Sequence, residues 1–413
     1  MFLFVVSGVS IFPFSHLDLA SLGSPEKNLF SAIFLFVVYA AVFILLRVRV
    51  SQIILNVIIL FQQNYLSIYL GLTVFSAFWS ATPFITLKAA ISLVLISSFA
   101  VYFARKYNWR QLLELLRWNQ TFVALLSAFL AIFVPSEGLN EKGWAGALGH
   151  PINLGNMMAL TAALWLLNAT QNSKYRRRSL LFCVLSIVIM QLANSAGAFV
   201  VFLSLIVIIF IPQIFRKLTF LQANFLFTFI LSIFAAPSIW LFSNPNNTMS
   251  LLGKDMTFTG RVPLWNLLIT EIIPERPWFG YGYSGFWQPW RGSDNPAAII
   301  FRLIGDWAVH AHNGFLDIII SVGLIGLMIF ALSFLNNVGR AIKLIFGNRS
   351  PESFVPLFML TDVFMTNLSH STIVMPTYIW FLYVLTTVRL QIDSGQKKKK
   401  RNLSLFQNQT FTS

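Results

Sequence analysis

The chain has 413 residues, of which 57% are hydrophobic and only 10% are charged, and its formal net charge is +15. Because a soluble domain carries about 25% charged residues, this composition excludes an ordinary soluble protein and predicts a polytopic membrane protein. The basic residues form short clusters between apolar runs, whereas a nucleic-acid-binding protein gathers them on a solvated face. Nucleic acid is therefore excluded as a partner. The single cysteine, Cys183, lies within an apolar run and excludes an internal disulfide.

A helix that crosses a membrane needs about 17–25 mostly apolar residues. This criterion predicts an all-α membrane bundle of about twelve spans. They fall at 1–14, 29–46, 53–79, 85–104, 119–134, 152–168, 180–194, 198–212, 220–242, 313–334, 355–368 and 372–390. The first run has no basic leader and no small-residue cleavage site, which favours a retained span over a signal peptide. The chain then divides into an N-terminal bundle (1–242), a large loop (243–312), C-terminal transmembrane helices (313–390) and a basic tail (391–413).

The distribution of Lys and Arg predicts the orientation of these spans. If the tail is cytoplasmic, 21 of the 29 basic residues fall on the cytoplasmic side. Cytoplasmic loops carry an excess of Lys and Arg in membrane proteins. The pattern therefore predicts that both termini are cytoplasmic and that the large loop lies on the outer side.

Two segments between the spans have features of their own. Residues 107–118 place Trp109 and three leucines opposite Arg110, which is typical of a helix lying on the membrane surface. A simple connector that packs on the protein is the alternative. The loop 243–312 is too long for an ordinary connection. Its tryptophans argue against disorder: Trp265, Trp278, Trp287, Trp290 and Trp307.

Several polar side chains gather on the predicted outer side. His150 and Asn153 precede or begin one span, Lys88 lies just inside another, and Arg261 lies in the large loop. A cation beside hydrocarbon is costly and often marks a ligand site. The guanidinium of arginine matches the oxygens of a phosphate group. We therefore expect a phosphate group on a lipid carrier to bind here; a salt bridge from Arg261 to an acid or a headgroup is the alternative.

His310 and His312 stand just before the predicted span 313–334, in the stretch VHAHNGFLDIIISVGLIGLMIF (309–330). On a helix, alternate side chains would point in nearly opposite directions. A metal site needs three or four ligands, and only Asp306 is suitably spaced from His310, so no metal is predicted. The histidines either cap the span at the interface, or His312 lies beside a bound phosphate and shuttles a proton.

Four short patterns occur in order along the chain: T-G-R-x3-W at 259–265, P-x2-G-x-G at 277–282, A-H-N-x2-L at 311–316 and G-x2-G at 323–326. Together with FWSATPFITLKAA and GALGHPINLGNMMAL, they resemble the O-antigen ligase and Wzy-type polymerase superfamily. The similarity leans toward its ExoQ-like exopolysaccharide polymerase branch and covers most of residues 65–335.

The resemblance implies a GT-C-like helical membrane fold in the bacterial inner membrane. Such enzymes move a glycan from undecaprenyl diphosphate to an acceptor hydroxyl on the outer side, without a nucleotide sugar. The resemblance also implies that the reaction of the ligases needs no metal ion. By position, the catalytic roles fall on Arg261 and His312, with His150, Arg302 and Asn313 as supports. No cofactor is implied. The partners implied are a lipid-linked oligosaccharide, membrane lipids and other polysaccharide export proteins.

The chain departs from the family pattern at two positions. The family often has an Arg or Lys of the phosphate site where Ala196 stands, and a Glu where Ser321 stands. Lys88, Arg276 or Arg302 would have to replace the missing cation. Two other functions stay open: a transporter, for example of inorganic carbon, and a non-catalytic scaffold of an export system. A transporter would show broken or charged helices near mid-membrane and often inverted repeats.

Overall fold

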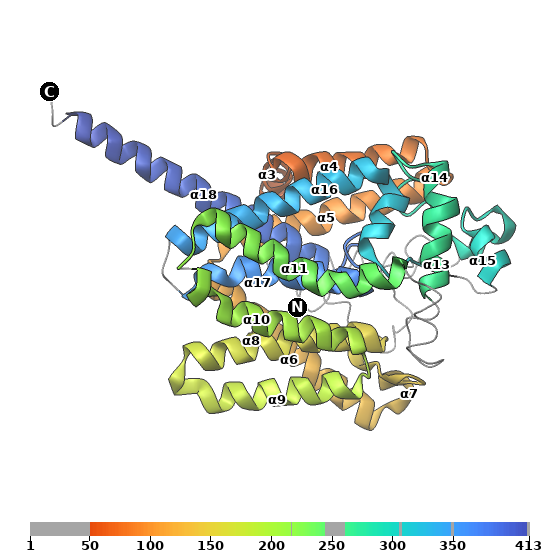
Figure 1. The fold of residues 1–413 in the computed structure, drawn as a ribbon, viewed down its shortest axis with the longest axis horizontal. Helices are drawn as coiled ribbons and strands as arrows, with labels where there is room; N and C mark the ends of the chain where they lie inside the picture. Colours follow the sequence, from red (N-terminus) through yellow and green to blue (C-terminus); the bar gives the residue numbers. More distant parts are fainter. Residues whose placement is uncertain (1–49, 216, 244–260, 305–307, 348–350, 411–413) are drawn as a thin grey trace.

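A computed structural model describes residues 50–215, 217–243, 261–304, 308–347 and 351–410, which are mostly helical (Figure 1). The longer helices are α3 (Val50–Phe61), α4 (Asn64–Phe75), α5 (Pro83–Lys106), α6 (Trp109–Phe133), α8 (Pro151–Gln171), α9 (Arg176–Leu192), α10 (Ala196–Phe215), α11 (Phe220–Ser243), α16 (Gly314–Gly347), α17 (Val355–Ser369) and α18 (Tyr378–Thr410). The short ones are α7 (Pro135–Gly138), α13 (Arg261–Leu267), α14 (Ile273–Glu275) and α15 (Ala298–Ile304). One small hairpin pairs β1 (Leu139–Asn140) with β2 (Gly143–Trp144).

The helices α5, α6, α8 and α16 are long and apolar enough to cross a membrane. The pair α3 and α4 would add a fifth span, while α10 and α11 contain shorter apolar stretches. The chain is thus a helical membrane protein, and the expected count of about twelve spans is not confirmed. The predicted spans 1–14 and 29–46 lie outside the described residues.

The prediction of one continuous span at 53–79 is wrong. The helical stretches Ile54–Phe61 and Asn64–Phe78 meet at an angle of 107°. The polar sequence Gln62–Gln63–Asn64 interrupts the apolar run at this point. The side chain of Gln63 donates a hydrogen bond to the carbonyl of Ile59 (3.1 Å), which supplies a polar partner where the helix ends.

A separate surface helix at 107–118 is also not observed. Helix α6 begins after Asn108, whose side chain forms a capping box with Gln111, and it continues without interruption to Phe133. Trp109, on the apolar face, is buried, and its Nε1 donates to Asp393 of α18 (2.8 Å). The apolar stripe therefore packs inside the protein, as the connector alternative expected, but as the first turns of a span.

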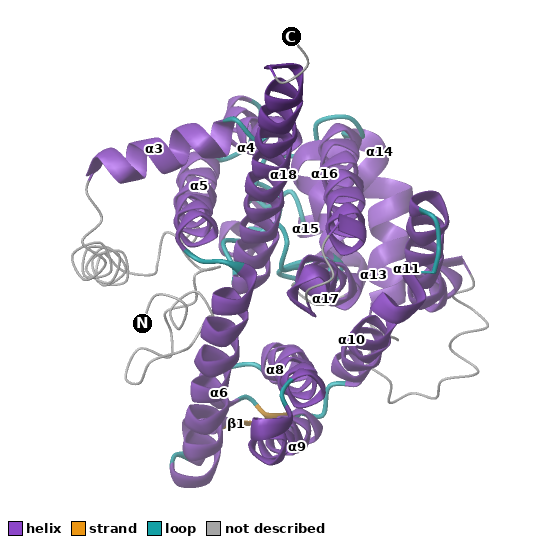
Figure 2. Cartoon of the chain, turned by 90° about the vertical axis from the view of Figure 1, so that its left-hand side faces the viewer, coloured by secondary structure: helices purple, strands orange, loops and turns teal. Residues whose placement is uncertain are grey.

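The core lies between α18 and the helices that surround it. Helix α18 packs against α5, α16 and α17, and its fully buried Trp380 donates a hydrogen bond to Ser97 of α5 (2.9 Å). A second group joins α8 to α9 and α10, and α10 in turn packs on α17 (Figure 2). The last turns of α18 extend away from the body (Figure 1). The start of α8 and the end of α17 are therefore positioned by one connected bundle.

The segment 277–282 of the large loop lies against α16. Tyr281 N–H donates to the carbonyl of Ile320 (2.8 Å), and Leu324 N–H donates to that of Pro277 (2.8 Å). Gly323, between these contacts, has φ 74° and ψ −176° and interrupts the helical backbone. Such a conformation is essentially restricted to glycine. The glycine patterns at 277–282 and 323–326 therefore belong to two segments that contact each other through their backbones.

Candidate functional site

Three histidines from two segments meet where α13 and α16 begin and α17 ends. His310 and His312 lie in the turn before α16, and His370 directly follows α17. The ring centroids of His310 and His312 are 4.0 Å apart, and those of His310 and His370 are 5.3 Å apart. One ring nitrogen of each lies within 4.8 Å of the others. We call these three side chains the histidine cluster.

The backbone explains how two histidines in alternate positions come together. His312 has φ 54°, and its N–H donates to Nδ1 of His310 (3.1 Å). Both residues therefore lie in a tight turn outside the helix, and the divergence expected for a helix does not apply. Asn313 then caps α16, because its Oδ1 accepts from the N–H groups of Phe315 (3.0 Å) and Leu316 (3.2 Å).

Arg261, the first residue of α13, is held beside the cluster. Its Nη1 donates to the carbonyl of Ser369 (3.1 Å), the residue before His370. One turn further, the buried Trp265 donates from Nε1 to the carbonyl of Ala311 (2.6 Å), which fixes α13 to the histidine turn. The structure thus brings Arg261 and His312, the two predicted catalytic residues, to the same place.

Burial and positive neighbours keep the histidine cluster uncharged at neutral pH. Removal from water lowers the pKa of His310 to about 4 and that of His312 to about 3. Burial also lowers the pKa of His370 well below its usual value. The charge of Arg261 lowers all three further. The site therefore consists of one permanent cation and three neutral imidazoles.

His370 was missed by the sequence reasoning because it belongs to no motif. Its Nε2 lies 2.8 Å from Oδ1 of Asn153 on the first turn of α8, so it joins α17 to α8. His150 caps the same helix, with its Nδ1 accepting from the N–H of Ile152 (3.2 Å). One signal could have found His370: it is one of only five histidines in the chain and it directly follows the predicted span 355–368.

The cluster supplies the third imidazole that was lacking for a metal site. Three histidines with an open position can hold a zinc ion. However, the charge of Arg261 acts on all three rings, and that of Lys142 acts on His312. Like charges repel more strongly away from bulk water. The electrostatics of the site therefore favour an anion over a metal cation.

Two comparisons with known proteins bear on this arrangement. Residues 181–331 match the family model described as O-antigen ligase. This region of the chain is similar to O-antigen ligases. The chain is also 25% identical over 273 residues to the exopolysaccharide production protein ExoQ of Rhizobium meliloti (strain 1021). That match covers 65% of this chain and 55% of the relative, so the chain spans about half of that protein's length.

The domain that matches the O-antigen ligase model, residues 181–331, accounts for only part of the site. Arg261, His310 and His312 lie within the matched residues, whereas Asn153 and His370 lie outside them. The site is therefore assembled from the domain and from the helices on either side of it. Helix α10, which lies within the matched residues, begins beside the end of α17. A Cβ at Gly197, the second residue of α10, would be 3.0 Å from the Ser369 hydroxyl.

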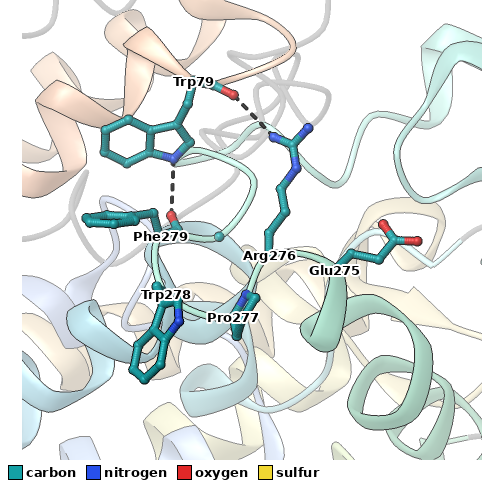
Figure 3. A pocket seen from close by; sticks show the side chains of 7 residues that line it. Trp79, Glu275, Arg276, Pro277, Trp278 and Phe279 are labelled. Atoms are coloured by element: carbon teal, nitrogen blue, oxygen red, sulfur yellow. Dashed lines mark hydrogen bonds between the residues drawn. The ribbon is translucent and has the colours of Figure 1, made fainter.

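The structure places Arg276 in a different pocket of about 470 Å³ (Figure 3). Its Nη1 donates to the carbonyl of Trp79 (3.4 Å), and its guanidinium lies over the ring of Tyr281. The indole of Trp79 in turn donates to the carbonyl of Phe279 (3.1 Å). None of the three clustered histidines lines this pocket.

Two further predicted cations are not brought to the histidine cluster. Lys88 is exposed on α5, and Arg302 is exposed on α15. Neither is among the charges that lower the pKa values of the clustered histidines. Instead, the additional charge comes from Lys142, at the turn of the β1–β2 hairpin, which the sequence reasoning did not single out.

The low pKa values predict that acid destabilises the fold. His310 and His312 have folded-state pKa values below the ordinary value of about 6.5, so the unfolded chain binds more protons. Their contribution to stability is complete above about pH 6.5 and is lost as the pH falls toward 4 and 3. We expect the unfolding temperature in detergent to fall between pH 7.5 and 4.5. It should fall less for His310→Asn, whose amide oxygen can accept the same backbone hydrogen bond. Identical pH curves would contradict the assignment.

Proposed function

We propose that the chain transfers a glycan from an undecaprenyl-diphosphate carrier to an acceptor hydroxyl during polysaccharide polymerisation or ligation. The reaction takes place on the outer side of the bacterial inner membrane, with both termini in the cytoplasm. The observation that carries this proposal is the convergence of Arg261 and His312 at one end of the membrane bundle. The match of residues 181–331 to the O-antigen ligase model and the similarity to an exopolysaccharide production protein support it.

The transfer breaks the bond between the sugar's anomeric carbon and the diphosphate oxygen, and it forms a bond from that carbon to the acceptor oxygen. Arg261 balances the charge that develops on the departing diphosphate, since its fork of N–H donors matches phosphate oxygens. Neutral His312 takes the proton of the acceptor hydroxyl. Its Nδ1 is buried and has no hydrogen-bond partner among the described residues, so it is available to accept. The sugar–diphosphate bond supplies the free energy.

The other predicted residues have supporting roles in this proposal. His150, Asn153 and Asn313 shape the binding site from the starts of α8 and α16. Arg276 lies in a pocket where Trp278 and Phe279 are 62% and 50% exposed. Exposed aromatic rings beside a cation suit the interfacial region of a membrane. We therefore assign Arg276, with Lys88 and Arg302, to contacts with the lipid carrier or the glycan away from the reacting bond.

Reconstitution tests the function directly. The purified chain is placed in liposomes with a polyprenyl-diphosphate oligosaccharide, and the products are separated by size. Longer lipid-linked products identify a polymerase, and transfer to a second acceptor identifies a ligase. The same vesicles report uptake of labelled bicarbonate. Uptake without any glycan transfer would replace the proposal by a transporter, a class for which the bend between α3 and α4 is also suitable.

A further inference from the structure

The two residues at the end of α17 hold both parts of the proposed site. The carbonyl of Ser369 accepts a hydrogen bond from Arg261 (3.1 Å). The ring of His370 packs edge-on against His310, and its Nε2 lies 2.8 Å from Oδ1 of Asn153. His370 is thus fixed on one side by α8 and on the other by the histidine turn. Its orientation is determined by tertiary contacts.

The second ring nitrogen of His370 has no such contact. Its Nδ1 is buried and has no hydrogen-bond partner among the described residues, and the same holds for Nδ1 of His312. Leaving a buried polar group without a hydrogen bond is unfavourable. Each case in a folded protein therefore calls for an explanation, such as a ligand. Two such nitrogens within one cluster indicate a ligand that forms hydrogen bonds, and the permanent charge of Arg261 beside them favours an anionic one.

The start of α10 adds a second reason for a ligand contact at this point. Gly197 lies against Ser369, and the residue before it is Ala196, where the resemblance leads us to expect a cation of the phosphate site. The position of the missing charge is therefore next to residues 369–370. His370 directly follows Ser369, so it is a titratable residue one position along the chain from the contact with Gly197.

We propose that His370 binds the diphosphate through Nδ1, next to Arg261, and takes the role of the cation absent at Ala196. This inference rests on the proposed function, because it assigns a residue to the same diphosphate site. With Nε2 donating to Asn153, a second proton at Nδ1 makes the imidazole a charged donor. An anion at hydrogen-bond distance favours the charged form and raises the pKa of the ring.

The other titratable and charged groups around His370 determine how far its pKa is lowered in the free protein. They come from His310 and His312 before α16, from His150 before α8 and from Arg261 on α13, and all lower the pKa of His370. The free protein therefore holds the ring neutral, and diphosphate binding is coupled to proton uptake. Affinity for diphosphate should fall as the pH rises from 6 to 8, unlike binding to a site built from arginines alone.

Two substitutions distinguish a role of His370 in binding diphosphate from a role in holding Asn153. In His370→Gln the side-chain amide can still reach Asn153, but nothing replaces Nδ1. In His370→Asn an amide group takes the place of Nδ1, but the contact with Asn153 is lost. Inorganic diphosphate is titrated into the purified full chain in detergent with EDTA, by calorimetry at pH 6, 7 and 8, and thermal unfolding is recorded for each variant.

We expect His370→Gln to bind diphosphate about tenfold more weakly than the wild type, as for loss of one hydrogen bond to a charged group. Its pH dependence should be flatter, while its unfolding temperature stays close to that of the wild type. His370→Asn should retain more affinity than His370→Gln. Wild-type affinity in His370→Gln, or the reverse order of the two variants, would show that His370 only holds Asn153 and would overturn the inference.

The outcomes also distinguish this inference from the proposed function. Diphosphate binding that depends on His370, in a protein that transfers no glycan, would leave the inference standing and remove the function. Glycan transfer that is unaffected by His370→Gln would do the opposite. Diphosphate binding that requires added zinc and disappears with EDTA would assign the histidine cluster to a metal, which would also overturn the inference.

Discussion

Replacement of Arg261 by alanine is expected to reduce glycan transfer by at least about a hundredfold, the usual effect of removing a group that stabilises developing charge. In the free protein the three clustered histidines are uncharged at neutral pH, and His370 gains a proton only together with the diphosphate, so none of them replaces the permanent charge of Arg261. The measurement is product formation in proteoliposomes at saturating lipid-linked donor. The loss should appear in kcat as well as in KM, because the charge to be balanced grows as the diphosphate departs.

Two control variants make this result specific. Arg110→Ala removes an exposed arginine from the first turn of α6 that is not among the charges acting on the histidines, and it should retain most of the activity. Arg261→Lys keeps the charge but loses the fork that matches two phosphate oxygens, so an intermediate loss is expected. If cells that produce Arg261→Ala at normal levels still make full-length polysaccharide, Arg261 is not at the reaction centre.

Composition was sufficient to predict the class of the protein, and short motifs singled out two residues that the structure brings together. The low content of charged residues predicted a helical membrane protein. The motifs T-G-R and A-H-N indicated Arg261 and His312 as candidate site residues. These two residues meet because the loop between them folds back through Trp265, which donates to the carbonyl of Ala311. The tryptophans of this loop were visible in the sequence, but the burial of Trp265, which attaches α13 to the histidine turn, is visible only in the structure.

Other features depend on contacts that a single sequence does not display. His370 belongs to the site because α17 ends beside α8, where its ring is held by a hydrogen bond to Asn153 and by contact with His310. Arg276 was expected near the diphosphate, but it points to the carbonyl of Trp79 in another pocket (Figure 3). The bend at Gln63 was missed because spans were predicted from hydropathy averaged over about 20 residues, and such an average hides a short polar interruption.

Replacement of Gly323 by alanine is expected to destabilise the protein by about 3 kcal/mol or more. Its φ of 74° is unfavourable for any residue with a side chain, and a Cβ would overlap the carbonyl group of Trp278. Relief of that overlap requires the segment 277–282 to separate from α16, with loss of the hydrogen bond from Leu324 to Pro277. Thermal unfolding in detergent and the protein level in membranes measure the effect.

Gly339 provides a matched control within the same helix. It lies in the regular part of α16, and a Cβ there would meet nothing within 4 Å. Gly339→Ala should therefore be neutral or stabilising by up to about 1 kcal/mol, the difference in helix propensity. Equal stability of the two variants would contradict the packing described for Gly323. Because α16 begins at Gly314, directly after His312 and Asn313, displacement of its first turns by Gly323→Ala should also reduce glycan transfer, whereas Gly339→Ala should leave it unchanged.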